Sequence, residues 1–165
     1  MKNLLAVVAV LLAATAVRAQ DHADCPMAHS KSKGAGVDPR HDEVTGVHHE
    51  HAVHHFFFAP SGGTIRLEAT DAGQEDARDR IREHLRVIAR SFATGDFALP
   101  MLIHDQVPPG VEVMKKMKAA IHYDFAPTDK GGEVRISTQD PAARAAVHAF
   151  LRFQIEDHGT GDPTE

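Results

Sequence analysis

The sequence predicts an α+β fold in which a four-stranded antiparallel sheet carries two long helices on one face. The first observation is a near repetition, since HHFFFAPSGGTIRL at residues 54–67 returns as HYDFAPTDKGGEVRI at residues 122–136. The second is that a segment with helical periodicity follows each copy. A unit of strand, Gly-Gly turn, strand and helix is therefore expected twice, over residues 54–92 and 121–158. Both units lie in one domain that spans residues 51–162.

In the first unit, alternation along the chain places His54 and Phe56 on one face of a strand and His55 and Phe57 on the other. The next strand, residues 64–70, alternates in the same way, and the preceding Gly-Gly pair is expected to form the hairpin turn. A helix is predicted over residues 74–92, with an apolar stripe of Ala77, Ile81, Leu85, Ile88 and Phe92.

The second unit follows a connecting segment in which residues 111–120 are predicted to form a short helix. Ile121, Tyr123 and Phe125 share the inward face of its first strand. Asp140 is the expected N-cap of the last helix, with proline at the first helical position, and Gly159 is the expected end. The two units together form the four-stranded sheet and its two helices.

Residues 1–19 have the features of a signal peptide: Lys2, an apolar run over residues 4–17, and a small-x-small motif at residues 17–19. The chain is therefore expected to be exported to the periplasm or secreted. No later apolar run has the length needed to span a bilayer. The single cysteine, Cys25, has no partner for an internal disulfide.

Residues 20–50 are rich in histidine and in small polar residues and contain few large apolar ones, so a disordered tail is predicted. Soft and borderline donors are concentrated there, which is typical of metal capture. The alternative is a solvated linker whose histidines bind nothing. The donors expected to capture metal are Cys25, Met27, His29, His48, His49 and His51.

Inside the domain, three histidines occupy positions where the other repeat has a large apolar residue. His54 is matched with Ile121, His84 with Phe150, and His158 with Phe92. An imidazole buried without a partner costs about 1–3 kcal/mol, so these rings need hydrogen bonds, water or a metal. We expect His54, His84 and His158 to converge as metal ligands, with His148 and His104 as further ligands or supporting groups. The alternative is three separately satisfied histidines at the edge of the core.

A second candidate site lies on the outward face of the sheet. His55 and His122 occupy matched strands, and Asp124 shares the side of His122. If the two strands are neighbours, these side chains offer two nitrogens and one carboxylate to a metal. The alternative is a polar sheet face, which could instead contact a partner chain or a second copy.

Several function classes are excluded by composition and motif. The formal net charge of −5 argues against nucleic acid as a partner. The chain has no HExxH, GxSxG or CxxC motif and no P-loop, so no catalytic residue is assigned. Covalent c-type haem needs two cysteines, whereas non-covalent haem bound by histidine remains compatible with the sequence.

The segments HHFFFAPSGG, GDFALPMLIH and HAFLRFQIEDHGTGD resemble a family of small exported bacterial proteins that is sometimes labelled aspartate carbamoyltransferase. The resemblance covers about residues 54–162 and implies the same compartment and domain boundary. The enzymatic label is rejected, because carbamoyltransferases have two larger α/β domains with an STRT phosphate loop.

The leading hypothesis is a periplasmic protein that binds a transition metal and acts in its buffering, delivery or tolerance. Copper is favoured because the tail combines cysteine, methionine and histidine, while zinc and nickel are alternatives that need only histidines. Haem held between the sheet and the helices is a close variant. A small histidine-dependent enzyme and an interaction module that uses the polar sheet face are the alternatives from other classes.

Overall fold

A computed structural model describes residues 37–164. The predicted signal peptide and the tail residues before 37, with Cys25, Met27 and His29, lie outside the described residues. The elements, in chain order, are α1 (Val37–Thr45), η1 (His49–His51), β1 (Ala52–Ala59), β2 (Gly62–Ala69), α2 (Glu75–Thr94), α3 (Ala98–His104), α4 (Val111–Lys116), η2 (Lys118–Ala120), β3 (His122–Pro127), β4 (Gly131–Ser137) and α5 (Pro141–His158).

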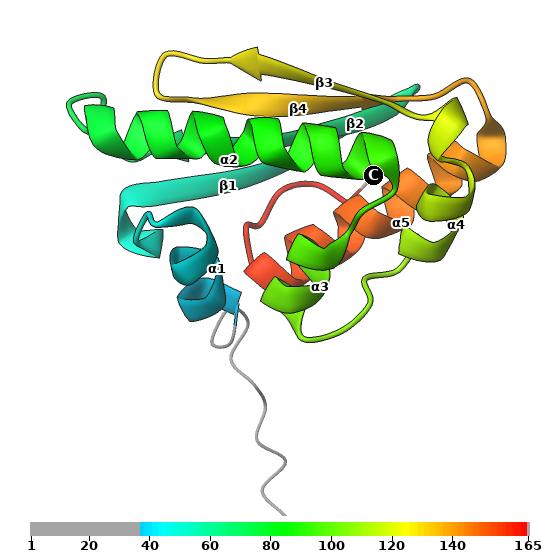
Figure 1. The fold of residues 1–165 in the computed structure, drawn as a ribbon, viewed down its shortest axis with the longest axis horizontal. Helices are drawn as coiled ribbons and strands as arrows, with labels where there is room; N and C mark the ends of the chain where they lie inside the picture. The colour runs from blue at the N-terminus through cyan, green and yellow to red at the C-terminus, as the bar shows by residue number, and fades with distance from the viewer. Residues whose placement is uncertain (1–36, 165) are drawn as a thin grey trace, which may run out of the picture. The chain divides into compact units, whose positions relative to one another are not determined.

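The four strands form one antiparallel sheet in the order β1-β2-β4-β3, so the predicted α+β class is confirmed (Figure 1). The two central strands pair with Ile65 opposite Val134. Alternate side chains of β2 are buried, as expected of a sheet with one face in the core. Helix α2 packs against β2, β3 and β4, and α5 packs against β1 and β2.

The register of the hairpins corrects the alignment of the two halves. Phe56 pairs with Ile65 in the first hairpin, and Phe125 pairs with Val134 in the second. Because Ile65 and Val134 are themselves opposite each other, the structural counterpart of His54 is Tyr123 and not Ile121. The difference arises because residues 60–61 connect the first hairpin, whereas the longer segment 128–131 separates Pro127 from its partner in the second.

The Gly-Gly pairs begin strands β2 and β4 and do not form the turns that were expected of them. A Cβ atom on Gly63 would overlap the carbonyl oxygen of Phe57 and the side chain of Leu151. Glycine is therefore required where α5 lies closest to the sheet.

Residues 37–50 were predicted to belong to a disordered tail, but α1 and η1 are folded against the rest of the domain. Two small apolar side chains anchor this segment, Val37 and Val47, each only 4% exposed. Arg40 donates from Nε to the carbonyl oxygen of Ile103 in α3. A few well-placed apolar residues are thus enough to dock a segment whose composition is otherwise that of a linker.

The last helix begins and ends as the sequence predicts. The Asp140 carboxylate accepts hydrogen bonds from the backbone N–H groups of Ala142 (2.8 Å) and Ala143 (3.0 Å). Gly159 ends α5 in the left-handed conformation, with φ of 67°. These two signals fix the position of His158, which is the final residue of the helix.

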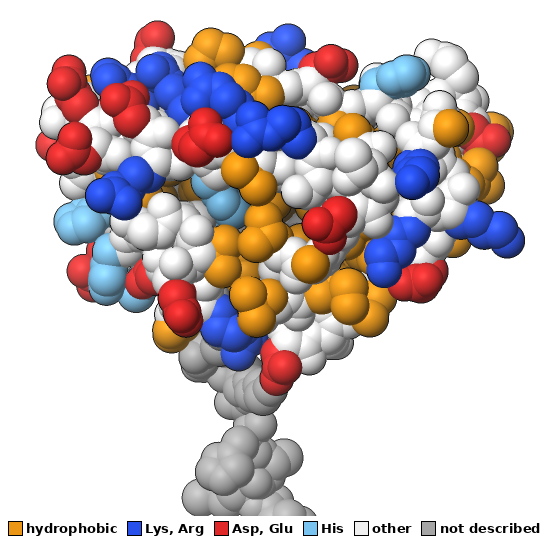
Figure 2. Space-filling view, viewed as in Figure 1, with side chains coloured by type: hydrophobic (Ala, Val, Ile, Leu, Met, Phe, Trp, Pro, Cys, Tyr) orange, Lys and Arg blue, Asp and Glu red, His pale blue; other side chains and the backbone are white. Residues whose placement is uncertain are grey.

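Arginine side chains line the exposed side of α2 and are interspersed with Asp and Glu of the same helix (Figure 2). In the same view a histidine side chain is visible in a recess beneath the helix. Within residues 37–164, no helix combines the length and the apolar character that a membrane crossing requires.

We predict that Gly63→Ala lowers the free energy of unfolding by about 1–3 kcal/mol, the usual effect of overpacking a tight contact. Urea denaturation measures the change. Gly73→Ala is the control, because its new Cβ would have no neighbour closer than 3.7 Å. Equal stability of both variants would contradict the close packing of Phe57 and Leu151 around Gly63.

Candidate metal centre

Five histidines line one cavity, and each comes from a different element. They are His41 of α1, His54 of β1, His84 of α2, His104 of α3 and His158 of α5. The cavity has a volume of about 40 Å³, and apolar side chains including Phe56, Ile88 and Phe150 form the rest of its wall. The structure therefore brings together His54, His84, His158 and His104 and adds His41. We call these five residues the inner histidines.

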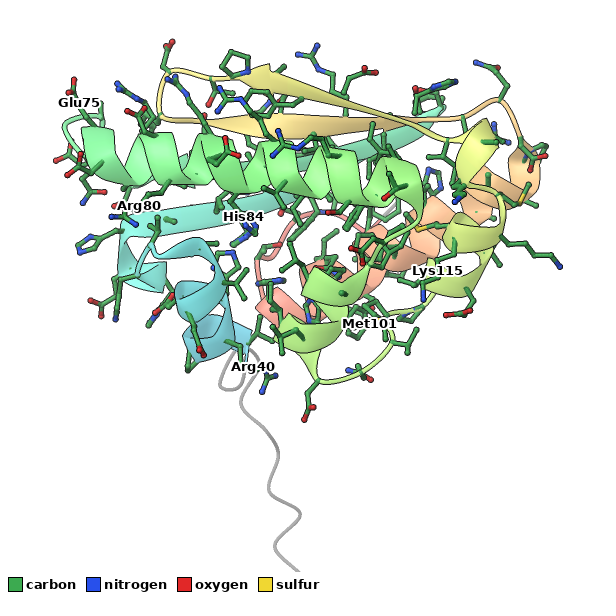
Figure 3. All side chains as sticks on the ribbon, in the orientation of Figure 1. Arg40, Glu75, Arg80, His84, Met101 and Lys115 are labelled. Atoms are coloured by element: carbon green, nitrogen blue, oxygen red, sulfur yellow. The ribbon has the colours of Figure 1, made fainter. Side chains whose placement is uncertain are left out.

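Local periodicity explains why three of these rings point into the cavity. His54 shares its face of β1 with the buried Phe56, two residues on. His158 lies one turn after the buried Gln154, on the same side of α5. His84 precedes the buried Leu85 and lies on the side of α2 that faces α1 (Figure 3).

His41 is the hub of the group. Its ring centre lies 4.3 Å from that of His54, 5.7 Å from that of His84 and 6.1 Å from that of His158, in each case edge to face. The rings of His54 and His158 stack at 4.7 Å. Two imidazoles on one ion have ring centres roughly 5 Å apart, because metal–nitrogen bonds are about 2 Å long. The ring centres are thus spaced as on a shared ion, but no three ligand nitrogens of the inner histidines lie within 4.8 Å of one another in the described structure, so binding would require the rings to rotate about their terminal side-chain torsions.

Burial keeps four of these rings, those of His41, His54, His84 and His158, neutral at pH 7. Desolvation, with a smaller effect from the neighbouring His84, lowers the pKa of His41 from 6.5 to about 4. Desolvation likewise lowers the pKa of His84 to about 4 and, together with His104 and His41, that of His158 to about 3. Burial and the neighbouring imidazoles also lower the pKa of His54 well below 6.5. Neutral imidazole is the form that binds metals.

His41 also has a ring nitrogen whose hydrogen-bonding capacity is unsatisfied. It is 4% exposed, and its Nε2 is buried without a hydrogen-bond partner. A buried polar atom in that state costs about 1–3 kcal/mol. A water molecule or a metal ion in the cavity would satisfy it.

His104 differs from the other inner histidines because both ring nitrogens are engaged. Nδ1 lies 2.6 Å from a carboxylate oxygen of Asp157, and Nε2 lies 2.9 Å from Oε1 of Gln154. A carboxylate behind an imidazole fixes the orientation of the ring and raises its basicity, as in many metal sites. His104 is thus held in place by α5 through both ring nitrogens.

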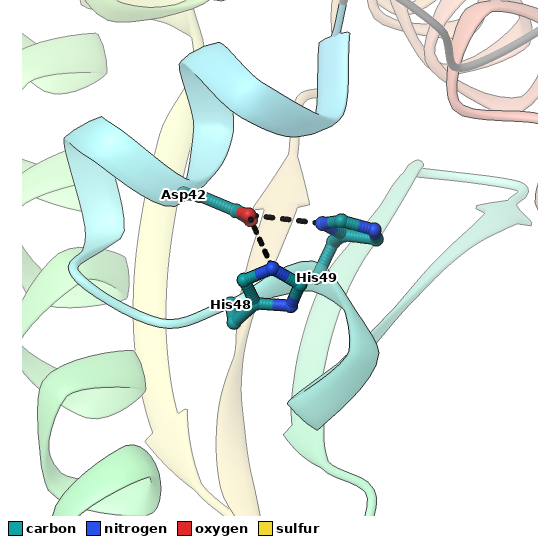
Figure 4. Close-up of side chains that lie close together, drawn as sticks. All are labelled: Asp42, His48 and His49. Carbon is teal, nitrogen blue, oxygen red and sulfur yellow. Dashed lines mark hydrogen bonds and ion pairs between the residues drawn. The ribbon is translucent and has the colours of Figure 1, made fainter.

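A second group of ligands lies at the surface, formed by Asp42, His48 and His49, which we call the outer cluster (Figure 4). Oδ2 of Asp42 is 2.9 Å from Nδ1 of His49 and 3.8 Å from Nε2 of His48. Each residue offers one ligand atom, and the three atoms lie within 4.8 Å of one another. Among residues 37–164, this is the group of three or more His, Cys, Asp or Glu side chains that meets this distance. Oδ1 of Asp42 is buried with no hydrogen-bond partner. The outer cluster is thus a possible binding site for a metal ion.

The structure places other predicted ligands elsewhere. Nε2 of His148 lies 3.1 Å from the carbonyl oxygen of Ala59 and 2.9 Å from that of Gly62, so this ring braces the first hairpin. His51 lies beside His48, with ring centres 6.1 Å apart, but its Nδ1 faces Gln74 at 3.1 Å. Neither ring belongs to the inner histidines or to the outer cluster.

The second candidate site is not assembled. His55 and His122 lie on β1 and β3, which are the opposite edges of the sheet, so the expectation of neighbouring strands is wrong. His55 instead contacts Asp162 through Nδ1 at 2.9 Å. Asp124 is exposed on β3, on the far edge from His55.

His41 and Asp42 were missed because residues 20–50 were assigned to a disordered tail. The available signal was a short helical pattern, with Pro39 in the first turn and valines at positions 37, 44 and 47.

Comparison of the chain with protein-family models, with curated proteins and with solved structures found no match in any of the three.

We predict that the metal-free protein loses stability as the pH falls from about 6.5 to 4. In that range the unfolded chain binds protons on imidazoles that the folded state keeps neutral, so the free energy of unfolding decreases with decreasing pH. His84→Gln removes one such imidazole. The dependence of the free energy of unfolding on pH should then become less steep by up to roughly 1.4 kcal/mol per pH unit. Urea denaturation across this range in the presence of a chelator measures the slope.

The control for this prediction is His122→Gln, which removes an exposed imidazole remote from the cavity. Equal flattening by the two variants, or stability that does not change between pH 6.5 and 4, would contradict the burial of neutral histidines.

Proposed function

We propose that the protein is an exported transition-metal-binding protein, with copper as the favoured ion, that acts in metal buffering, delivery or tolerance. The observation that supports this best is the convergence of five imidazoles from five elements on one cavity. Burying imidazoles without hydrogen-bond partners lowers the stability of an otherwise apolar core, and a bound metal ion would offset that cost.

The cavity suits an ion better than a large cofactor. A water molecule needs roughly 10–15 Å³ of comparable space, so about 40 Å³ holds an ion with little solvent. Pockets for organic ligands usually measure about 300–1,000 Å³. Haem bound by the inner histidines would require the helices to move apart.

The donor set favours copper among transition metals. His41, His54, His84 and His158 offer neutral nitrogens, which suit copper, zinc and nickel, and copper(II) binds most strongly to a given site in this series. Cys25, Met27 and His29 would add soft donors earlier in the chain. The apolar wall of the cavity excludes water and so strengthens each metal–nitrogen bond.

The inner histidines divide into two roles in this proposal. His41, His54 and His158 are the primary ligands, because the ring of His54 lies 4.3 Å from that of His41 and 4.7 Å from that of His158. The ring of His84 lies 5.7 Å from that of His41 and is a further ligand. His104 is a supporting residue, held by Asp157. The expected signal peptide and His-rich tail fit a protein that meets metal outside the cytoplasm.

The test uses the full chain with Cys25→Ser, Met27→Leu and His29→Gln, so that these tail donors do not contribute. Copper titration with electron paramagnetic resonance should show one equivalent in an all-nitrogen environment. Adding His54→Gln and His158→Gln should abolish that signal, because loss of ligands exceeds the roughly 10–100-fold effect of losing a supporting residue.

The matched control adds His122→Gln and His55→Gln, which removes the same number of imidazoles from the sheet edges. Circular dichroism verifies that both variants are folded. Unchanged copper binding after loss of His54 and His158 would show that the inner histidines are structural.

A further inference from the structure

A groove connects the outer cluster with the inner histidines. Its volume is about 210 Å³, and its walls include His49 of the outer cluster together with His41, His54 and His158. The same three inner histidines line the buried cavity. These three residues therefore border both the cavity and the groove.

Helix α1 presents a ligand to each site from consecutive residues. Neighbouring residues of an α-helix project about 100° apart, so His41 reaches the cavity while Asp42 reaches the outer cluster. Each of the two has a buried atom without a hydrogen-bond partner, Nε2 of His41 and Oδ1 of Asp42. Each site thus has a buried, unpaired ligand atom that could bind a cation.

We infer that the outer cluster is an entry site for a divalent transition-metal ion, which then passes along the groove to the inner histidines with His49 as the connecting ligand. This inference rests on the proposed function of the inner histidines.

The transfer needs only ligand exchange. A nitrogen of His41, His54 or His158 bonds to the ion before the bond to Asp42 is released, and His49 follows. The ion keeps its charge, and no proton or electron moves, because the incoming imidazoles are already neutral. A bare ion entering an apolar cavity would lose its hydration without compensation, whereas a coordinated ion exchanges one donor for another.

The outer cluster and the inner histidines differ in charge, and this difference gives them different roles in the transfer. Asp42 is the anionic member of the outer cluster and attracts a hydrated cation from solvent. The side chains of His48 and His49 are 53% and 43% exposed, so the entry site is open to that cation. The inner histidines include no carboxylate and retain the ion by nitrogen coordination in a cavity whose remaining wall is largely apolar.

The experiment is rapid mixing of copper(II) with the full chain that lacks the tail donors, followed by freezing and electron paramagnetic resonance at successive times. A site with one carboxylate and two imidazoles gives a different signal from a site with nitrogen ligands alone. In the parent protein, the mixed signal should appear first and decay as the all-nitrogen signal grows.

His49→Gln should slow growth of the all-nitrogen signal by about tenfold or more, in the range expected for loss of one supporting contact, and leave its final intensity unchanged. Asp42→Asn should slow it as well and is the second variant in case the first is misfolded. The control is His122→Gln, an exposed imidazole at the far sheet edge, which should not change the rate.

Growth at the parent rate in both His49→Gln and Asp42→Asn would overturn the entry route and leave the proposed function intact. If the all-nitrogen signal never appears in the parent protein, the proposed function is wrong, and the entry route falls with it.

Discussion

The docking of α1 against the domain is the interaction on which both candidate sites depend. Val37 and Val47 bury their side chains, and full burial of a side chain of this kind contributes about 1.5–3 kcal/mol. Arg40 adds a hydrogen bond to α3. This modest anchoring places His41 among three other rings and Asp42 beside His48 and His49. Without α1 the inner group loses its hub and the outer group its carboxylate.

The domain interior is divided between two kinds of ring. At one end Phe92 stacks on Phe97 with ring centres 4.3 Å apart and meets Phe150 edge to face at 5.8 Å. At the other end imidazoles take the place of phenyl rings. The cavity lies at this boundary, since Phe92 and Phe150 line it together with the inner histidines. A dry wall on one side and nitrogen donors on the other is an arrangement that excludes water from a bound ion.

Much of the fold could be predicted from the sequence because its signals are local. Alternation in β2 gave its buried face, and the Asp140-Pro141 pair gave the start of α5. Strand order could not be predicted, since the placement of β1 and β3 at opposite edges depends on which strands pair across the whole domain. That order separates His55 from His122.

The candidate site was predictable in part for the same reason. His54, His84 and His158 could be identified because each was matched with a large apolar residue in the other half of the chain. The pairing of His54 with Ile121 failed because the hairpin loops differ in length. The helical pattern around His41 is weak, because α1 is short and only slightly amphipathic, and its position depends on contacts with distant residues.

The most direct measurement is anomalous diffraction at the copper absorption edge from crystals of the copper-loaded protein. The account predicts a peak inside the cavity, within bonding distance of nitrogens from at least three of the inner histidines. Well-ordered rings in the present arrangement, with anomalous density confined to the outer cluster or absent, would contradict it.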